Sequence, residues 1–129
     1  ECIHQFKKYL TAPALECVTL VGGTDAKGPT RRLAGAPGVD VVSGTPGRVW
    51  DFIKRNKFDT SAVKFFVLDE ADRLLEDGHL EDIMKIFGKL PKGDDAKGRL
   101  QVSFFSATLH AQHIADSHRR RFCLCQQRW

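Results

Sequence analysis

Short apolar runs, separated by longer mixed segments, set the pattern along this chain. Most of these runs are nearly continuous in hydrophobicity rather than alternating, which is typical of strands covered on both faces, as in a parallel sheet. Four runs have the length of a strand, at 17–21, 39–42, 65–68 and 100–105.

The segments between the runs carry the spacing of helices. Thr45 and Pro46 form a plausible cap and first-turn pair, and the segment from His79 to Leu90 repeats apolar residues at helical intervals. Strands alternating with helices predict an α/β fold with a parallel, doubly wound sheet. Helices are predicted over 45–56, 79–90 and, more weakly, 29–34, with the end of another helix over 3–10.

Small or polar residues follow every one of the four apolar runs. In a parallel sheet the carboxyl ends of the strands lie at one edge, and ligands bind outside that edge. We therefore expect a functional site where the four runs end. The ends are Gly22-Gly23, Ser43 to Arg48, Asp69 to Asp72, and Ser106 to Thr108.

Three carboxylates follow the third run. Asp69, directly after an apolar strand, has the Walker B arrangement, in which an aspartate holds Mg²⁺ on the phosphates of a nucleotide. Glu70 is then placed to orient or activate the attacking water, and Asp72 to tie the loop to another element. The alternative is a helix that begins with acidic residues, which the helix dipole favours.

The other strand ends are individually weaker signals. Thr45 to Arg48 put backbone N–H groups at a helix start, where anions bind, with Gly47 allowing close approach and Arg48 adding charge. A nucleic-acid phosphate fits there, although an ordinary helix cap is the alternative. Ser106 and Thr108 offer hydroxyls to a neighbouring strand end, or they cap a helix over 109–116. Gly22-Gly23 alone indicates only a tight turn.

Composition sets limits on the class of protein. The 129 residues suffice for one domain, and the net charge of +4 permits an acidic partner such as nucleic acid without requiring one. No apolar run approaches the roughly 20 residues of a membrane helix. Four cysteines without a disulfide or CxxC pattern indicate a reducing, intracellular setting, and they do not distinguish nucleus from cytoplasm. A start at Glu1 predicts a piece of a longer protein or a processed one.

Taken together, the motifs resemble the DEAD-box family of ATP-dependent RNA helicases. Asp69-Glu70-Ala71-Asp72, with Thr45 to Arg48 before it and Ser106-Ala107-Thr108 after it, matches that family's first RecA-like domain in order and spacing. We expect residues 1–116 to form part of that RecA-like (P-loop NTPase type) domain, with helices on both faces of the sheet. The segments QFKKYL and SATLH most resemble the subtype carrying a SPRY domain.

The resemblance implies a role for each strand end. Asp69 would coordinate Mg²⁺ through water, Glu70 would activate the hydrolytic water, and Asp72 would contact the motif of Ser106 and Thr108, which couples hydrolysis to strand separation. ATP and Mg²⁺ are the implied cofactors, and single-stranded or duplex RNA and a second RecA-like domain are the implied partners. RNA would be contacted at phosphate and ribose, largely independently of sequence. The implied RNA path is lined by Gly22, Gly23, Thr45, Pro46, Gly47 and Arg48.

A phosphate loop of the form GxxxxGK[ST] is absent from the sequence. The segment 23–30 has Pro29 where lysine is required, and the segment 93–100 precedes its strand rather than following it. The family places this loop before residue 1, on a strand that pairs beside the strand leading to Ser106. We therefore expect no ATP hydrolysis by the chain alone. The sheet is expected to be incomplete, with an unpaired apolar edge along 100–105 that promotes aggregation.

The last thirteen residues, 117–129, do not resemble the family. They carry arginines and cysteines without helical spacing, so we expect a disordered tail or an artefact of gene prediction. A basic RNA-binding arm and a zinc site are alternatives; the zinc candidates are His113, His118, Cys123 and Cys125.

Two further functions compete with the helicase hypothesis. The chain could be a truncated, non-enzymatic module that binds RNA or protein, because such a module keeps the same strand ends. A metal-dependent nuclease built on Asp69, Glu70 and Asp72 is less well supported, because it leaves Thr45 to Arg48 unexplained.

Overall fold

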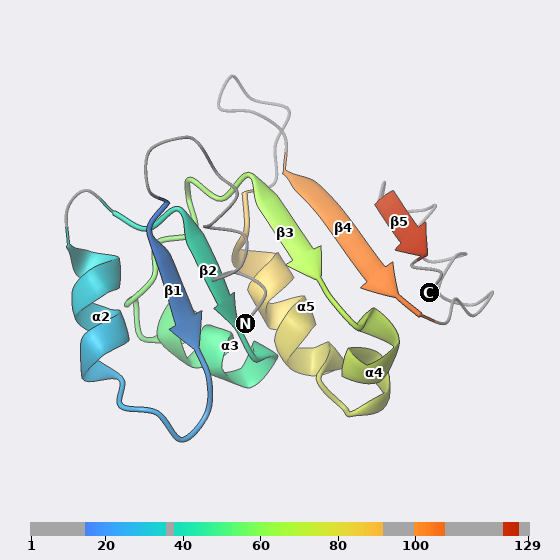
Figure 1. Ribbon diagram of the computed structural model, residues 1–129, viewed down its shortest axis with the longest axis horizontal. Coiled ribbons are helices and arrows are strands. Elements are labelled where there is room, and N and C mark those ends of the chain that lie inside the picture. The colour runs from blue at the N-terminus through green and yellow to red at the C-terminus, as the bar shows by residue number, and fades with distance from the viewer. Residues whose placement is uncertain (1–14, 36–37, 92–99, 108–122, 127–129) are drawn as a thin grey trace. The chain divides into compact units, whose positions relative to one another are not determined.

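The computed structural model of the protein describes residues 15–35, 38–91, 100–107 and 123–126 (Figure 1). The chain divides into two compact units, residues 1–59 and 60–129, each with its own sheet. None of the helices in the described ranges has the length and apolar character needed to cross a membrane.

The first unit is a β-α-β arrangement followed by a second helix. Strand β1 (Cys17–Leu20) leads to α2 (Lys27–Ala34), then β2 (Val41–Gly44) and α3 (Pro46–Lys54). The two strands pair in parallel, from Cys17 opposite Val41 to Leu20 opposite Gly44. Parallel pairing requires a crossover between the strands, and α2 lies within it.

The core of the first unit forms between its strands and α3. Val18 and Leu20 of β1 are buried together with Phe52 of α3, whereas Thr19 between them is exposed. This alternation follows from the strand geometry, which turns successive side chains to opposite faces. The partly buried neighbours of this core are Ala26, Leu33, Val39, Val42, Val49 and Phe58.

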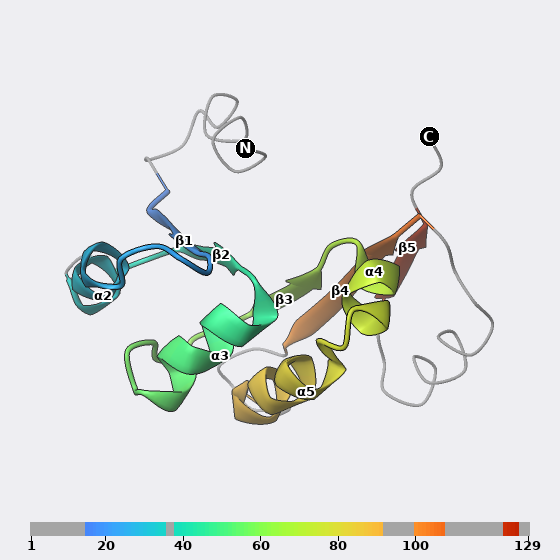
Figure 2. The same ribbon diagram turned by 90° about the horizontal axis from the view of Figure 1, so that it is seen from below.

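The second unit is a three-stranded parallel sheet with two helices. Strand β3 (Phe65–Leu68) is followed by α4 (Ala71–Glu76), α5 (Leu80–Lys89), β4 (Gln101–Ser106) and β5 (Cys123–Gln126). The strand order is β3-β4-β5, so β4 is central. The core consists of Leu68, Ala71 and Ile83, and Figure 2 shows α5 along one face of β3 and β4.

The structure confirms the predicted fold class, an α/β fold with parallel strands and intervening helices. The predicted helices over 45–56 and 79–90 are α3 and α5, and the weaker one is α2, which begins earlier, at Lys27. The predicted end of a helix over 3–10 lies outside the described residues.

Coverage of β3 differs from the expectation of strands buried on both faces. Phe65 and Val67 are 66% and 54% exposed, while Leu68 is buried against α4 and α5. The continuous apolar run therefore hides an alternation, because one face of this strand packs in the core and the other does not.

The C-terminal segment departs most from expectation. Residues 123–126, within the tail expected to be disordered or artefactual, form β5 and pair in parallel with Ser103 to Ser106 of β4. The predicted unpaired edge of β4 is therefore wrong over these four residues. The physical reason is that an edge strand offers a row of backbone donors and acceptors, which any extended segment within reach can pair with.

Candidate functional site

The carboxyl ends of β1 and β2 meet at one end of the first unit. Thr45 donates its N–H to the carbonyl of Leu20 over 3.0 Å, so the loop after β2 begins beside the turn after β1. A Cβ atom at Gly44 would overlap the carbonyl oxygen of Leu20 and lie 3.0 Å from Cγ2 of Val49. Glycine at position 44 is thus what allows the two strands to end so close together.

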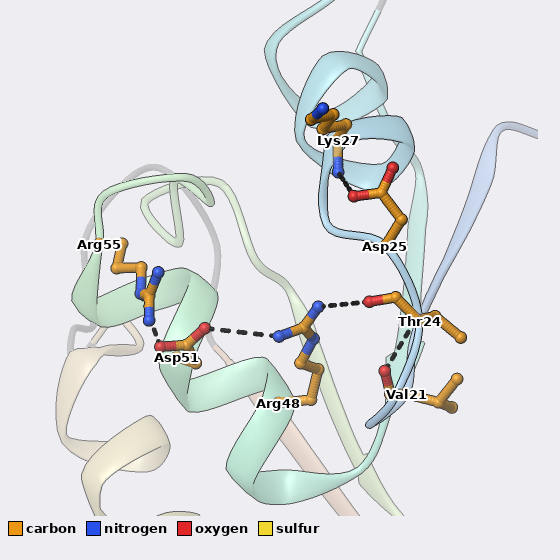
Figure 3. Close-up of polar contacts among 7 residues, drawn as sticks. All are labelled: Val21, Thr24, Asp25, Lys27, Arg48, Asp51 and Arg55. Carbon is orange, nitrogen blue, oxygen red and sulfur yellow. Dashed lines mark hydrogen bonds and ion pairs between the residues drawn. The ribbon is translucent and has the colours of Figure 1, made fainter.

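The turn after β1 holds itself by local contacts. Gly23 has a φ of 75°, which glycine adopts without strain. The hydroxyl of Thr24 donates to the carbonyl of Val21 over 2.8 Å, and Asp25 accepts the N–H of Lys27 at 3.1 Å, just where α2 begins. Figure 3 shows these contacts beside α3.

Arg48 fastens this turn to the start of α3. Its Nη2 donates to the carbonyl of Thr24 over 2.9 Å, and its Nη1 lies 3.7 Å from Oδ2 of Asp51 (Figure 3). The guanidinium carbon also sits 5.2 Å from the ring centroid of Phe52, within range of a cation–π interaction. Asp51 in turn accepts the Nε–H of Arg55 at 2.7 Å. Arg48 is therefore a structural bridge between two strand ends as well as a surface cation.

The N-terminus of α3 offers fewer free N–H groups than a typical helix start. Thr45 is the N-cap residue and Pro46 the first helical residue, as predicted, but the Thr45 side chain forms no capping bond. Arg48 and Val49 both donate their N–H groups to the carbonyl of Thr45 over 3.0 Å, and proline has none. The exposed Gly47 is left to offer an N–H to an anion in this turn.

In the second unit, the carboxylates lie where β3 ends. Leu68 pairs with Phe104, so β3 and β4 leave the sheet at the same end, with Asp69 and Glu70 exposed. Asp69 Oδ1 accepts the N–H of Glu70 at 3.0 Å.

Glu70 has a left-handed backbone, with φ 48° and ψ 47°, and it is the residue that precedes α4. A non-glycine residue in this region is uncommon, and such strain gathers at functional sites. The Glu70 carboxylate pairs with Arg73 over 3.2 Å, but both side chains are largely exposed, at 67% and 72%. We therefore expect this pair to hold Glu70 only weakly.

Asp72 and Ser106 are buried, in contrast to Asp69 and Glu70. They are 8% and 5% exposed, and α4, which carries Asp72, lies against β4, which ends in Ser106. Asp72 Oδ1 accepts the N–H of Arg73 at 2.9 Å. Among the described residues, every buried side-chain nitrogen or oxygen has a hydrogen-bond partner. Thr108, the third member of the predicted set, lies outside the described residues.

The donor set at this strand end fits magnesium held together with a nucleotide. Within the described ranges, no three or more His, Cys, Asp or Glu side chains gather as they would in a metal site made by protein alone. Mg²⁺ usually keeps several waters and binds through one or two carboxylates plus phosphates. The exposed carboxylate of Asp69 suits that mode. Two of the predicted zinc candidates, His113 and His118, lie outside the described residues.

The family model described as DEAD/DEAH box helicase matches residues 1–117. The chain belongs to the DEAD/DEAH box helicase family. The ATP-dependent RNA helicase DDX1 of Xenopus laevis is 45% identical over 109 residues, and a probable ATP-dependent RNA helicase ddx1 of Dictyostelium discoideum is 41% identical over 112 residues. These alignments cover 84% and 87% of the chain but only 14% of either relative.

One solved structure agrees with the DEAD-box assignment. A DEAD box protein from Methanococcus jannaschii superposes with a TM-score of 0.70 at 27% identity, covering 88% of this chain and 30% of that one. The RecA-like fold expected from the resemblance is confirmed. The family model ends at residue 117, so β5 lies beyond the matched segment.

Sequence reasoning missed two features of this DEAD-box site. The contact from Arg48 to the Thr24 carbonyl joins residues 24 positions apart, and nothing in the sequence marks a carbonyl as an acceptor. Asp51 was a readable signal, because it lies three residues after Arg48 and four before Arg55, spacings at which helical side chains meet.

Proposed function

We propose that this chain is part of the first RecA-like domain of an ATP-dependent RNA helicase, and that its strand ends serve Mg-ATP hydrolysis and RNA binding. The observation that carries the proposal is the arrangement after β3, where exposed Asp69 and Glu70 are followed by buried Asp72 on α4, which packs on β4. Exposed carboxylates remain available to a ligand, whereas a buried one must be tied to its surroundings.

The roles of the carboxylates follow from that difference in burial. Asp69 would hold Mg²⁺ through water, and the ion would neutralise charge on the transferred phosphoryl group. Glu70 would orient and deprotonate the attacking water. Asp72, through the packing of α4 on β4, would link the nucleotide-binding loop after β3 to the motif of Ser106 and Thr108. A movement of that loop would then be transmitted to this motif.

The RNA path would follow the end of the first sheet. Gly47 offers an exposed N–H at the start of α3, Arg48 adds positive charge, and the Gly22-Gly23 turn leaves room for a backbone to approach. These groups suit phosphate and ribose rather than base edges, so binding would be largely independent of sequence. The net charge of +4 does not bear on this path, because the tail arginines Arg119, Arg120, Arg121 and Arg128 account for all of it.

The chain alone would bind RNA without hydrolysing ATP. Its sequence holds no GxxxxGK[ST] loop, and the relatives named as ATP-dependent RNA helicases are about seven times longer than the segment they share with it, since that segment is 14% of each. The identity to two DDX1 helicases supports the expectation of the SPRY-containing subtype. A non-enzymatic RNA-binding module is thus the second candidate for the chain taken by itself.

RNA binding is tested by fluorescence anisotropy with labelled oligouridine and oligoadenosine of equal length at fixed salt. We expect similar affinities for the two RNAs and a loss of about five- to tenfold in Arg48→Ala, because a phosphate contact and the fastening of the turn disappear together. Arg55→Ala is the matched control, since it removes the same charge from the C-cap of α3, and it should change affinity less than about twofold. Equal losses in both variants would point to general charge rather than to a site.

ATP hydrolysis is tested separately, by phosphate release with Mg²⁺ and saturating RNA. We expect background rates for this chain. Activity that disappears in Asp69→Asn would contradict the proposal that the chain alone is inactive, and would favour an intact ATP site within it.

A further inference from the structure

The central strand of the second sheet is paired on both sides, and one of its partners comes from the C-terminal end. Phe65 to Leu68 of β3 pair with Gln101 to Phe104, and Cys123 to Gln126 of β5 pair with Ser103 to Ser106. Ser103 and Phe104 therefore have a neighbour at each edge. The partner β5 lies beyond the segment that the family model matches.

The β4 edge that β5 covers has the features that make an edge strand hazardous. Strand β4 spans six residues, QVSFFS, with Val102 buried and no charged or proline residue to discourage pairing. Exposed edges of that kind add strands from other molecules. Parallel strands need a crossover of about a dozen residues or more, and residues 107–122 are long enough to supply one.

We propose that β5 is an intramolecular edge cap: residues Cys123–Gln126 occupy the strand-accepting edge of β4 and exclude any other strand from it. One edge accepts one strand, so a second copy of the chain cannot add there while β5 is docked. The same holds for the strand that carries the phosphate loop, which the family resemblance expects beside the strand leading to Ser106. This inference does not depend on the proposed helicase function, but ATP hydrolysis in a longer protein would require β5 to leave this edge to the phosphate-loop strand.

Two truncated chains isolate the contribution of β5. One ends at Phe122 and lacks β5; the other ends at Gln126 and keeps it. Both lack Arg128, so they differ only by the uncharged residues CLCQ. Amide hydrogen exchange followed by mass spectrometry reports the β4 edge, and the peptide covering β1 serves as an internal control for folding. Light scattering reports self-association.

In the chain ending at Phe122 we expect faster exchange at 103–106, by about tenfold for about two amides, because alternate N–H groups of a strand point to each edge. The same chain should self-associate as its concentration rises. The chain ending at Gln126 should match the full chain in both measurements. A synthetic peptide of residues 120–129, added to the shorter chain, should restore protection at 103–106 and return it to a monomer.

Three results would overturn the proposal. The first is equal protection at 103–106 in the two truncated chains. The second is protection in the full chain that appears only in a dimer, which would mean that the strand comes from a second copy. The third is a loss of protection throughout the chain ending at Phe122 that the peptide of residues 120–129 does not restore. In that case β5 would be needed for folding and would not be an independent cap.

Discussion

The loop after β2 and the loop after β3 both follow a parallel strand and both begin a helix, yet they are held in different ways. At the first, Arg48 reaches 24 residues back to the carbonyl of Thr24 and also contacts Asp51 and Phe52. At the second, the described contacts of Glu70 span one, three and four residues, to Asp69, Arg73 and Leu74.

This difference suggests how much each loop depends on a ligand. The Arg48 side chain is held by a hydrogen bond, an ion pair and an aromatic face of the protein itself, so we infer that the loop after β2 is preorganised. The exposed Glu70 carboxylate lies on a strained backbone and has only local partners, so we expect a bound ligand to fix its final position. We therefore expect mutations in the loop after β2 to act mainly by lowering stability. Mutations of the carboxylates after β3 should act mainly by impairing ligand binding or reaction.

The largest effect is expected from a substitution at Gly44, where the preorganised loop leaves β2. Gly44→Ala should lower the free energy of unfolding by about 2–4 kcal/mol, because the added Cβ overlaps the carbonyl oxygen of Leu20. Urea denaturation measures it through the fluorescence of Trp50 in a Trp129→Phe background. Gly28→Ala is the control: a Cβ there meets nothing within 4 Å, so it should be neutral or slightly stabilising. Similar midpoints for both variants would show that the close approach at Gly44 is unimportant.

Replacing Arg48 by lysine would separate the effect of its positive charge from the effect of its contacts in the same loop, and we expect a smaller change in stability. Arg48→Lys keeps the positive charge but loses the planar fork that contacts Thr24 and Asp51. We expect a loss of about 1 kcal/mol in the free energy of unfolding and about a two- to fivefold weaker affinity for oligouridine. Anisotropy and urea denaturation of the same samples measure both. Unchanged affinity would show that charge alone matters.

At Glu70, in the strained loop after β3, glycine should be the more stabilising replacement because the backbone there is left-handed. Glu70→Gly should be more stable than Glu70→Ala by about 1 kcal/mol, because glycine adopts the left-handed backbone without the Cβ penalty that alanine retains. Comparing the two variants cancels the loss of the carboxylate and of its pair with Arg73. Thermal denaturation of both proteins gives the difference, and alanine as the more stable variant would contradict the strain.

The smallest effect belongs to a surface pair on α5, which sets the scale for exposed charges. A hydrogen bond from Lys85, and then its charge, lower the pKa of Glu81, and the same pair raises the pKa of Lys85. The Glu81 contribution is therefore present above its unfolded pKa and lost as the pH falls through its folded pKa. Glu81→Gln should lower Tm slightly at neutral pH and not at strongly acidic pH. A larger difference in Tm between the two proteins at acidic pH than at neutral pH would contradict this prediction.

Much of the fold was readable because its elements depend on local pattern. The run from Phe65 to Leu68 and the pair Thr45-Pro46 mark a strand and a helix start through spacing and chain stereochemistry alone. The exposure of Phe65 was not readable, because a continuous apolar run does not say which face will be covered. Strand β5 was missed for a related reason: its pairing depends on an open edge elsewhere in the chain, and its own residues carry no strong strand pattern.

The site was predictable to the level of residue identity but not of contacts. Asp69 and Glu70 stand at the end of β3 as the sequence indicates, while their assigned roles stay predictions. The fixing of Arg48 by a carbonyl, and the loss of N–H donors in the first turn of α3, depend on backbone geometry that residue types do not encode.

The connection between β4 and β5 determines the concentration at which a strand from another molecule can displace β5. A segment joined to its own acceptor through a short connection experiences an effective concentration on the order of millimolar, whatever the amount of protein in solution. A free strand with the same intrinsic affinity would have to exceed that concentration to take half of the β4 edges. A longer connection would lower this threshold only slowly, so the length of the connection has a small effect on how well β5 competes for the β4 edge.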